Sequence, residues 1–408
     1  MHIVFSDMPL PTEQTKSIFL EGPSPRSQEV GDWRQEFVAT LEDMGFDGTL
    51  YIPIPRNRFY PTGTFENDPS WTYDGQVAWE QGARAMSDVL LCWVDRRIDR
   101  SRKDLGMPGF TTNVEFGEDL HTGKLVYGRP DGADKISYLD ECVRGAGLAV
   151  HTTIRSACDE ALERLGAGAK RVGAETQVPL FIWNTASFKS WYGHLLQAGN
   201  RLDGAKVLSQ VCFGSAVHPF VFSYCIKVNI WVASEQRHKS NEIIVARPDI
   251  SAVVALYRTP EGSTKIVLVR EFRSPVNNAQ GMVYELPAGS CLNDGLSPDE
   301  NAQQELHEET GLLISDASRF RQIGCRQLAA TFSTHRAHVV GVELNTHEFE
   351  RLVASQGVAF GEPAATSSGE RTYVELASLD EVFALPVDYS TLGMIYEALR
   401  VFGHLKQQ

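Results

Sequence analysis

The fold of the C-terminal half is decided by the stretch Asn301-Ala-Gln-Gln-Glu-Leu-His-Glu-Glu-Thr-Gly-Leu312. On a helix, Glu305, Glu308 and Glu309 share one face, because residues three and four positions apart are neighbours. Three carboxylates on one face repel each other and weaken a bare helix. We therefore expect divalent cations to neutralise them. Ligation by oxygen atoms alone favours Mg²⁺ or Mn²⁺, which bind a diphosphate and activate a water molecule.

This segment resembles the Nudix box, whose family pattern is G-x5-E-x7-R-E-U-x-E-E-x-G-U, where U is aliphatic. The stretch from Glu305 to Leu312 matches the core of the pattern. Gly289, which ends the run Tyr284-Glu-Leu-Pro-Ala-Gly289, takes the place of its first glycine. The resemblance implies an α+β Nudix fold, in which helices sandwich a mixed sheet, with Glu308 and Glu309 as catalytic residues. The metal ligands that it implies are Glu305, Glu308, Glu309 and Gly289.

Two departures from the family pattern bear on activity. Gln304 stands where the family has an arginine that holds a glutamate in place. Leu296 falls where the family has its first glutamate, because the loop after Gly289 is one residue longer. Two alternatives to diphosphate hydrolysis therefore stay open. One is an acidic, solvated helix face, and the other is a nucleotide- or ADP-ribose-binding sensor or regulator with one or both sites catalytically degenerate.

The flanking residues resemble the ADP-ribose pyrophosphatase branch of that family. Val269-Arg-Glu-Phe-Arg-Ser-Pro275 precedes the Glu-Leu-Pro-Ala-Gly run that begins at Glu285. By this resemblance, Arg270, Arg273 and Glu285 are candidates for binding substrate or metal. Glu370, in a Ser/Gly-rich loop, is a weaker candidate for the late-loop glutamate of the branch.

The N-terminal half alternates predicted strands with predicted helices, which indicates a parallel α/β sheet. Short apolar runs predict the strands, and apolar residues at helical spacing predict the helices. The predicted strands are Ser17–Glu21, Gly48–Pro53, Asp88–Val94 and Lys124–Tyr127, and the predicted helices are Trp33–Met44, Asp74–Met86, Asn113–Leu120 and Thr153–Leu165.

A lone acidic residue, Glu115, lies between apolar residues in Gly109-Phe-Thr-Thr-Asn-Val-Glu-Phe-Gly117. Thr111, Thr112 or Asn113 is placed to cap the helix that follows, and the dipole at a helix start keeps a nearby carboxylate ionised. An ionised, partly buried carboxylate is what a glycosyl nucleophile requires. A structural glutamate that caps a helix is the alternative.

Four local motifs carry a family resemblance in this half: Phe19-Leu-Glu-Gly-Pro-Ser24, Tyr73-Asp-Gly-Gln76 with Trp79-Glu80, Ser87-Asp88, and Thr111-Thr-Asn-Val-Glu-Phe-Gly117. Roughly residues 15–145 resemble the nucleoside 2-deoxyribosyltransferase-like family, including its nucleotide N-glycosidase relatives. The resemblance implies a flavodoxin-like sheet, Glu115 as the nucleophile at the anomeric carbon, and Glu80 as the acid that protonates or orients the base. An ordinary exposed helix acid is the alternative for Glu80. The relatives have an aspartate where this chain has Gly109, so transfer and hydrolysis both stay open.

Four further residues are candidates for substrate binding in this half. Ser24 and Arg26 are placed to hold a 5′-phosphate, with a simple turn as the alternative. Trp71, in a polar loop, is the candidate for stacking on the base. Asn113 lies two residues before the predicted nucleophile.

The 408 residues are predicted to form two domains. Residues 1–166 form the deoxyribosyltransferase-like domain, and 167–177, rich in small residues, form a linker. Residues 178–408 form the Nudix domain, with 178–245 as a β-rich N-terminal extension. Because extensions of this kind serve dimerisation in that branch, we expect a homodimer.

The composition of the chain limits the kinds of molecule that we expect it to bind. A net charge of -14 argues against nucleic-acid binding, which needs a basic surface. Seven dispersed cysteines without a C-x-x-C pair are typical of reduced thiols. The sequence has no apolar signal region, and no run approaches the about 18 apolar residues of a membrane span. We expect a cytoplasmic, bifunctional enzyme with small-molecule nucleotide substrates, which combines Nudix hydrolysis with N-glycosidic bond cleavage or transfer.

Overall fold

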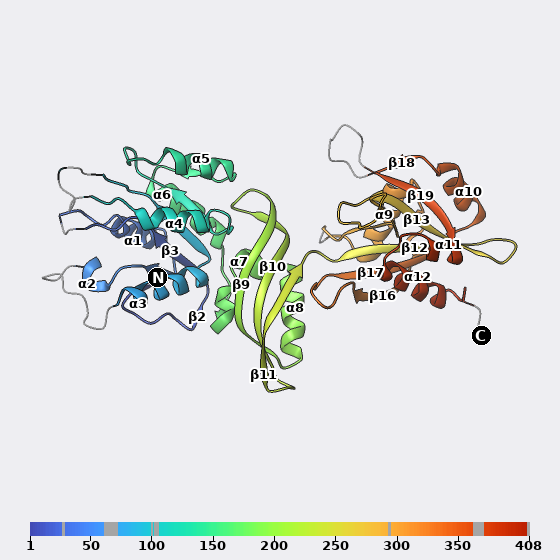
Figure 1. Ribbon diagram of the computed structural model, residues 1–408, viewed down its shortest axis with the longest axis horizontal. Helices are drawn as coiled ribbons and strands as arrows, with labels where there is room; N and C mark the ends of the chain where they lie inside the picture. The colour runs from blue at the N-terminus through green and yellow to red at the C-terminus, as the bar shows by residue number, and fades with distance from the viewer. Residues whose placement is uncertain are drawn as a thin grey trace. The chain divides into compact units, whose positions relative to one another are not determined.

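The computed structural model describes residues 1–26, 29–60, 72–98, 101, 106–292, 295–361 and 371–405. The chain forms two compact units, Met1–Ala246 and Arg247–Gln408 (Figure 1). This division lies far from the predicted linker at 167–177. No helix among the described residues has both the length and the apolar character needed to cross a membrane.

The first unit contains a six-stranded sheet in which every neighbouring pair of strands is parallel. The three central strands are buried along their whole length, as expected when helices cover both faces. The predicted parallel α/β architecture is therefore confirmed. Across the sheet the order is β1 (His2–Phe5), β4 (Thr49–Ile52), β3 (Ser17–Glu21), β5 (Val89–Trp93), β6 (Leu125–Gly128) and β7 (Val150–His151).

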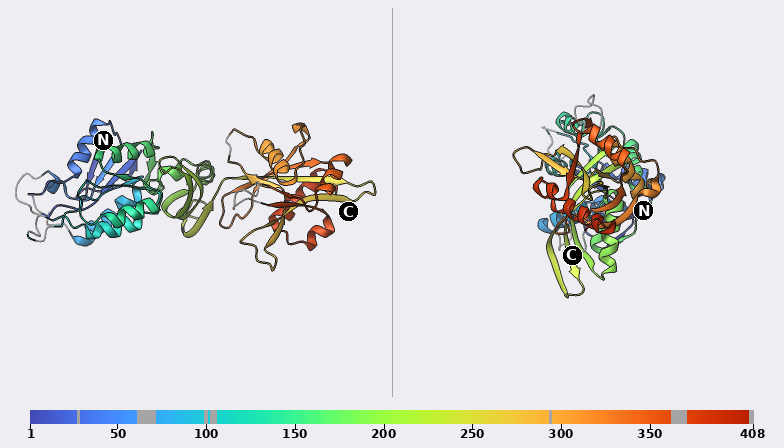
Figure 2. Two further views of the ribbon diagram at one scale, coloured as in Figure 1. Left: turned by 90° about the horizontal axis from the view of Figure 1, so that it is seen from above. Right: turned by 90° about the vertical axis from the view of Figure 1, so that its right-hand side faces the viewer.

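Helices cover both faces of this sheet (Figure 2). On one face, α1 (Arg34–Asp43) and α6 (Ile154–Leu165) pack against Leu91 and Trp93 of β5. On the other face, Leu90 packs with α3 (Tyr73–Met86), and Cys92 packs with α4 (Phe110–Asp119) and α5 (Ser137–Gly145). Successive side chains of a strand alternate between faces, so one apolar run serves both layers. A short helix, α2 (Arg56–Phe59), follows β4.

The predicted linker contains a buried arginine. Arg171 lies in β8 (Arg171–Val172), which pairs with β2 (Glu13–Gln14), and its side chain is fully buried. Its guanidinium donates to both carboxylate oxygens of Asp88, at 2.7 and 2.6 Å, and to the carbonyl of Val178 at 2.8 Å. Asp88 also accepts from the backbone N–H of Leu180 at 3.0 Å. The segment is therefore tied to the sheet by a buried ion pair.

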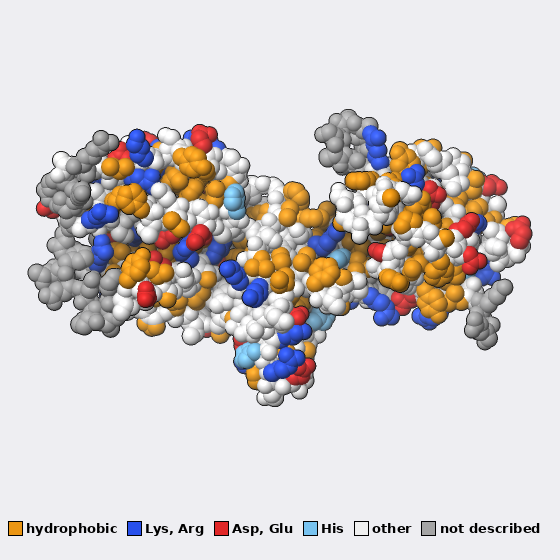
Figure 3. Space-filling view, viewed as in Figure 1, with side chains coloured by type: hydrophobic (Ala, Val, Ile, Leu, Met, Phe, Trp, Pro, Cys, Tyr) orange, Lys and Arg blue, Asp and Glu red, His pale blue; other side chains and the backbone are white. Residues whose placement is uncertain are grey.

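After a 3-10 turn (Gly173–Gln177) and α7 (Leu180–Trp183), the first unit ends in a three-stranded antiparallel sheet. The strands are β9 (Arg201–Gly214), β10 (Pro219–Val232) and β11 (Arg237–Ala246). Phe188 and Tyr192 of α8 (Ala186–Gln197) pack on Tyr224 and Ile226. Exposed apolar side chains lie elsewhere on this sheet, including Phe213. Hydrophobic side chains are also visible on the surface of this middle part of the chain in Figure 3. The sequence analysis joined this region to the C-terminal domain, and that assignment stays a prediction.

The second unit contains a mixed sheet. Only β12 and β17 pair in parallel, and the other pairs are antiparallel. The order is β16 (Arg321–Gln327), β17 (Arg336–Glu343), β12 (Ile250–Arg258), β13 (Thr264–Phe272), β19 (Thr372–Ser378) and β18 (Ala359–Phe360), with β14 (Met282–Glu285) on β13 and β15 (Ala288–Ser290) on β12.

Helices sandwich the sheet of the second unit as well. One face packs against α9 (Pro298–Thr310) and α10 (Thr346–Ser355). The other face packs against α11 (Leu379–Ala384) and α12 (Tyr389–Val401). A 3-10 turn (Ala317–Arg319) precedes β16. The predicted mixed sheet between helices is therefore confirmed for this unit.

Loss of the buried ion pair should destabilise the first unit strongly. We expect Arg171→Ala to lower the free energy of unfolding by about 3–5 kcal/mol, because it leaves the Asp88 carboxylate buried without its cation. Urea unfolding measures this. The control is Arg155→Ala, which removes an exposed arginine that pairs with Asp43 at 3.1 Å and should change stability by less than about 1 kcal/mol. Equal effects of the two variants would contradict the assignment.

Candidate functional site

The acidic helix of the second unit, α9, begins through local signals. Ser297 caps it, with its side chain accepting from the N–H of Glu300. The Glu300 carboxylate in turn accepts from the N–H of Ser297 at 2.8 Å, so both form a capping box. Pro298 occupies the first turn, where its missing N–H costs nothing.

Two of the predicted metal ligands contact the same backbone stretch of β15. A Cβ placed on Gly289 would lie 1.8 Å from Oε1 of Glu305, so only glycine leaves room for this carboxylate. Glu309 is 5% exposed, and its Oε2 accepts from the N–H of Ala288 at 3.2 Å. The helix and the strand therefore meet through two carboxylates.

The third predicted ligand has different surroundings. Glu308 is exposed, and its Oε1 accepts from the side-chain amide of Gln304 at 2.7 Å. Gln304 thus binds Glu308 from the position at which the Nudix pattern has an arginine, but Gln304 carries no positive charge. Among the described residues, no three acidic, histidine or cysteine side chains are grouped to hold a metal. Oxygen donors suited to Mg²⁺ are nevertheless present in Glu305 and Glu309.

The predicted substrate-binding residues of this unit lie on adjacent strands and near their ends. Arg273 donates to Glu285 at 2.8 and 3.0 Å. Arg270 donates to Glu375 at 3.2 Å, and its guanidinium lies 4.8 Å from the ring centre of Tyr373. The sequence analysis missed Glu375 and Tyr373, which β19 brings beside β13. Glu370, the late-loop candidate, lies outside the described residues.

In the first unit, the helix that carries Glu115 starts earlier than predicted. Gly109 precedes α4 with a φ of 59°, a left-handed conformation that glycine adopts without strain. Asn113 therefore lies inside the helix, and Glu115 lies in its second turn rather than at the start. Asn113 is exposed and accepts from Arg96. Glu80 lies on α3, where Gln76 donates to its carboxylate at 2.8 Å.

A buried carboxylic acid that the sequence analysis missed lies at the carboxyl end of β3. Glu21 is fully buried, and neither of its carboxylate oxygens has a hydrogen-bond partner among the described residues. Burial raises its pKa well above the usual range, and the negative charges of Asp119 and Glu115 raise it further. Glu21 is therefore harder to ionise in the folded chain than an ordinary glutamate. A glutamate at the end of an apolar strand was the only sequence signal.

Glu115 differs from the permanently ionised carboxylate that the sequence predicted. Burial raises the pKa of Glu115 to about 7, and the nearby charge of Glu80 contributes, while Arg84 and Arg34 oppose the rise. Burial also raises the pKa of Glu80. These acids therefore exchange protons more readily near neutral pH than ordinary glutamates do.

Glu21, Glu80, Glu115 and Asp119 are called the acidic group below, and two arginines lie near them. Arg84 donates to Asp119 at 2.7 and 3.1 Å. Arg34 is fully buried and donates to the carbonyl of Gly22 at 2.8 Å, beside the end of β3. Of the other predicted residues, Ser24 is half-buried and Arg26 is exposed in the loop after β3. Trp71 lies outside the described residues.

Comparison with known proteins identifies part of the chain. Residues 248–396 match the family model of the NUDIX domain. The match confirms the Nudix part of the sequence prediction, and it gives no support to the deoxyribosyltransferase-like part, which stays a prediction. No curated protein matches the chain.

The buried acid Glu21 should make stability depend on pH. An unfolded glutamate loses its proton near pH 4.3, whereas burial raises the pKa of Glu21 in the folded chain. The folded state then binds more protons, so its stability falls as pH rises from about 4 towards neutral. Glutamine has no proton to lose, so we expect Glu21→Gln to remove this fall in stability. The free energy of unfolding of the variant, compared with that of the unaltered chain, should therefore increase as pH rises. Thermal melting across pH tests this, with the exposed Glu118→Gln as control, and a pH-independent difference would refute it.

Gly289→Ala should separate folding from activity. The added Cβ would collide only with the end of a flexible side chain, the Glu305 carboxylate, so we expect little change in melting temperature. Displacing that carboxylate should lower metal-dependent hydrolysis by about tenfold or more. Gly393→Ala in α12, where a Cβ meets nothing within 4 Å, is the matched control. Full activity in Gly289→Ala would show that the Glu305 position does not matter.

Proposed function

We propose that the chain is a bifunctional nucleotide-processing enzyme. In this proposal the Nudix unit hydrolyses a nucleoside diphosphate linked to another group, and the first unit cleaves an N-glycosidic bond. The observation that carries the first activity is the contact of Glu305 and Glu309 with one backbone stretch in a segment that matches the NUDIX domain. The observation that carries the second is Glu115, with a pKa of about 7, beside Glu80.

In the Nudix unit, Glu305 and Glu309 would hold the metal, with Glu308 as a third ligand. When bound, Mg²⁺ would neutralise diphosphate charge and lower the pKa of a water molecule. Arg270 and Arg273 are the candidates for binding the substrate phosphates, and each would have to turn from its carboxylate partner, Glu375 or Glu285, to do so. Either Glu308 or Glu309 would act as the base that takes a proton from the attacking water. Their surroundings differ, because Glu309 is buried and accepts a hydrogen bond from the backbone, whereas Glu308 is exposed.

In the first unit, the strand order supports the proposed deoxyribosyltransferase-like identity. When the edge strand β1 is left out, the order β4-β3-β5-β6-β7, numbered from β3, reads 2-1-3-4-5, which agrees with the order of flavodoxin-like sheets. Such sheets bind ligands outside the carboxyl ends of their strands, where the order reverses. In this chain the reversal lies between β3 and β5, next to Glu21.

The proposed glycosidic reaction uses the two acids in different protonation states. The Glu115 carboxylate attacks the anomeric carbon, the bond to the base breaks, and the base takes a proton from Glu80. Water then attacks the same carbon, Glu115 leaves as a carboxylate, and the proton of the water returns to Glu80. A second base in place of water would give transfer. Because the negative charge of Glu80 contributes to the raised pKa of Glu115, the proton that the pair shares would have to pass from Glu115 to Glu80 before the attack.

The two activities are separable by single substitutions. We expect Glu308→Gln to lower Mg²⁺-dependent diphosphate hydrolysis by about 100-fold or more while base release from a nucleoside monophosphate persists. Glu115→Gln should do the reverse. Mass spectrometry of a nucleotide panel that includes ADP-ribose measures both products. Glu350→Gln and Glu118→Gln, exposed acids of the two units, are the controls.

The outcomes distinguish the proposal from its alternative. Loss of both activities in either variant would sink the two-site scheme. Metal-dependent ADP-ribose binding without turnover by the unaltered chain would instead support the sensor or regulator. The neutral Gln304 contact of Glu308 is the observation that favours this alternative.

A further inference from the structure

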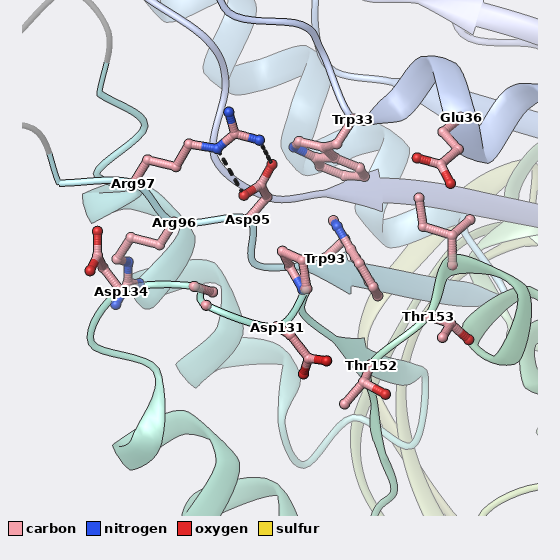
Figure 4. A pocket seen from close by; sticks show the side chains of 14 residues that line it. Trp33, Glu36, Trp93, Asp95, Arg96, Arg97, Asp131, Asp134, Thr152 and Thr153 are labelled. Carbon is pink, nitrogen blue, oxygen red and sulfur yellow. Dashed lines mark hydrogen bonds and ion pairs between the residues drawn. The ribbon is translucent and has the colours of Figure 1, made fainter.

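A cavity of about 650 Å³ opens at the carboxyl edge of the parallel sheet (Figure 4). Small-molecule sites commonly measure about 300–1,000 Å³, so its size suits a nucleoside. Its walls come from the segments that follow β5, β6 and β7 and from the start of α1. Neither Glu115 nor Glu80 is among its lining residues. The cavity is therefore separate from the acidic group proposed above for glycosidic chemistry.

Two buried side chains of the cavity wall have unused hydrogen-bond donors. Trp93 is 3% exposed, and its indole N–H has no partner among the described residues, although buried tryptophans usually have one. Arg96 is 5% exposed, and its Nε also lacks a partner in the described part of the chain. By contrast, the indole N–H of Trp33, on the same wall, donates to the carbonyl of Pro23 at 2.8 Å. An unused indole N–H on a cavity wall is available to a ligand that accepts hydrogen bonds, whereas the Nε of Arg96 is itself buried within the wall.

Carboxylates outnumber arginines around the cavity. Arg97 donates to both oxygens of Asp95, at 3.1 and 2.7 Å, so this pair is neutral (Figure 4). Arg96 is occupied by the carbonyl of Lys135 and by Asn113. The other three acids are exposed, and Asp131 also pairs with Arg129 at 3.3 Å. Among the described lining residues the balance is still negative, which disfavours phosphate and suits hydroxyl groups as hydrogen-bond donors. The acidic lining residues are Glu36, Asp95, Asp131 and Asp134.

We propose that this cavity binds the ribosyl group of an unphosphorylated ligand, either free ribose or a nucleoside. Its carboxylates accept hydrogen bonds from the sugar hydroxyls, as acidic residues near the strand ends of doubly wound sheets do. The indole N–H of Trp93 donates to a ring or hydroxyl oxygen. Thr152 and Thr153, which follow β7, add hydroxyl groups to the opposite wall. The proposal does not rest on either reaction proposed above.

A ligand in the cavity would also affect helix α4. Arg96 lines the cavity and also donates to Asn113, which lies two residues before Glu115 on α4. Because Arg96 lines the cavity, a ligand there would contact the same side chain that donates to Asn113 of α4. This arrangement couples the ribosyl cavity to the helix of the acidic group.

Isothermal titration calorimetry of the full chain with ribose, adenosine, AMP and inorganic phosphate tests the proposal. We expect ribose and adenosine to bind and phosphate not to bind, with AMP weaker than adenosine. Trp93→Phe keeps the ring but removes the N–H, and should weaken adenosine binding by about fivefold or more. Ala133→Phe places a ring in the cavity and should abolish it. The matched controls are Trp191→Phe and Ala198→Phe in and after α8, and these should bind adenosine normally.

Several results would overturn the proposal. They are absence of binding by both ribose and adenosine, AMP or phosphate binding as tightly as adenosine, and adenosine binding unchanged in Trp93→Phe and Ala133→Phe. Circular dichroism melting checks that each variant folds. If Ala133→Phe does not fold, the comparison of ligands on the unaltered chain and on Trp93→Phe still decides. Because titration needs no turnover, the test stands even if the proposed glycosidic reaction fails.

Discussion

The first unit depends on the buried ion pair between Asp88 and Arg171. The same carboxylate receives hydrogen bonds from Ser17 at 3.0 Å and from the N–H of Leu180 at 3.0 Å. One side chain therefore fixes the amino ends of β3 and β5, strand β8 and α7. Burial of a charge is tolerated there because every oxygen has partners. At the opposite, carboxyl edge of the same strands, Glu21 is equally buried but lacks such partners. The buried carboxylate at the amino edge of the sheet thus has hydrogen-bond partners, and the one at the carboxyl edge has none among the described residues. The cavity and the acidic group both lie at the carboxyl edge.

Features with local causes were predictable from the sequence. The acidic helix α9, which was predicted around Glu305, Glu308 and Glu309, spans Pro298–Thr310, and its cap, its first-turn proline and its apolar positions are neighbours in the chain. Most strands and helices of the first sheet were found for the same reason. The family motif likewise placed Gly289 near Glu305. In these cases the spacing of residues along the chain was enough to predict which of them lie close together.

Features that depend on distant partners were not predictable. The burial of Arg171 within the predicted linker 167–177 gave no sequence signal, because its partner Asp88 lies 83 positions away. Strand β9 was missed, because Gly204, Ser209 and Gln210 interrupt its apolar pattern. Glu21 gave no signal of its own, because its unusual pKa arises from burial and from charges on α4. The substrate-side neighbours Glu375 and Tyr373 likewise depend on strand pairing.

The contact between Glu305 and Gly289 also links the position of a proposed metal ligand to one backbone residue. Any residue other than glycine at position 289 would bring a Cβ to the place that the Glu305 carboxylate occupies, and this flexible side chain would have to move aside. The helix itself would keep its place, so a single change on the strand would alter the geometry of the site without altering the fold.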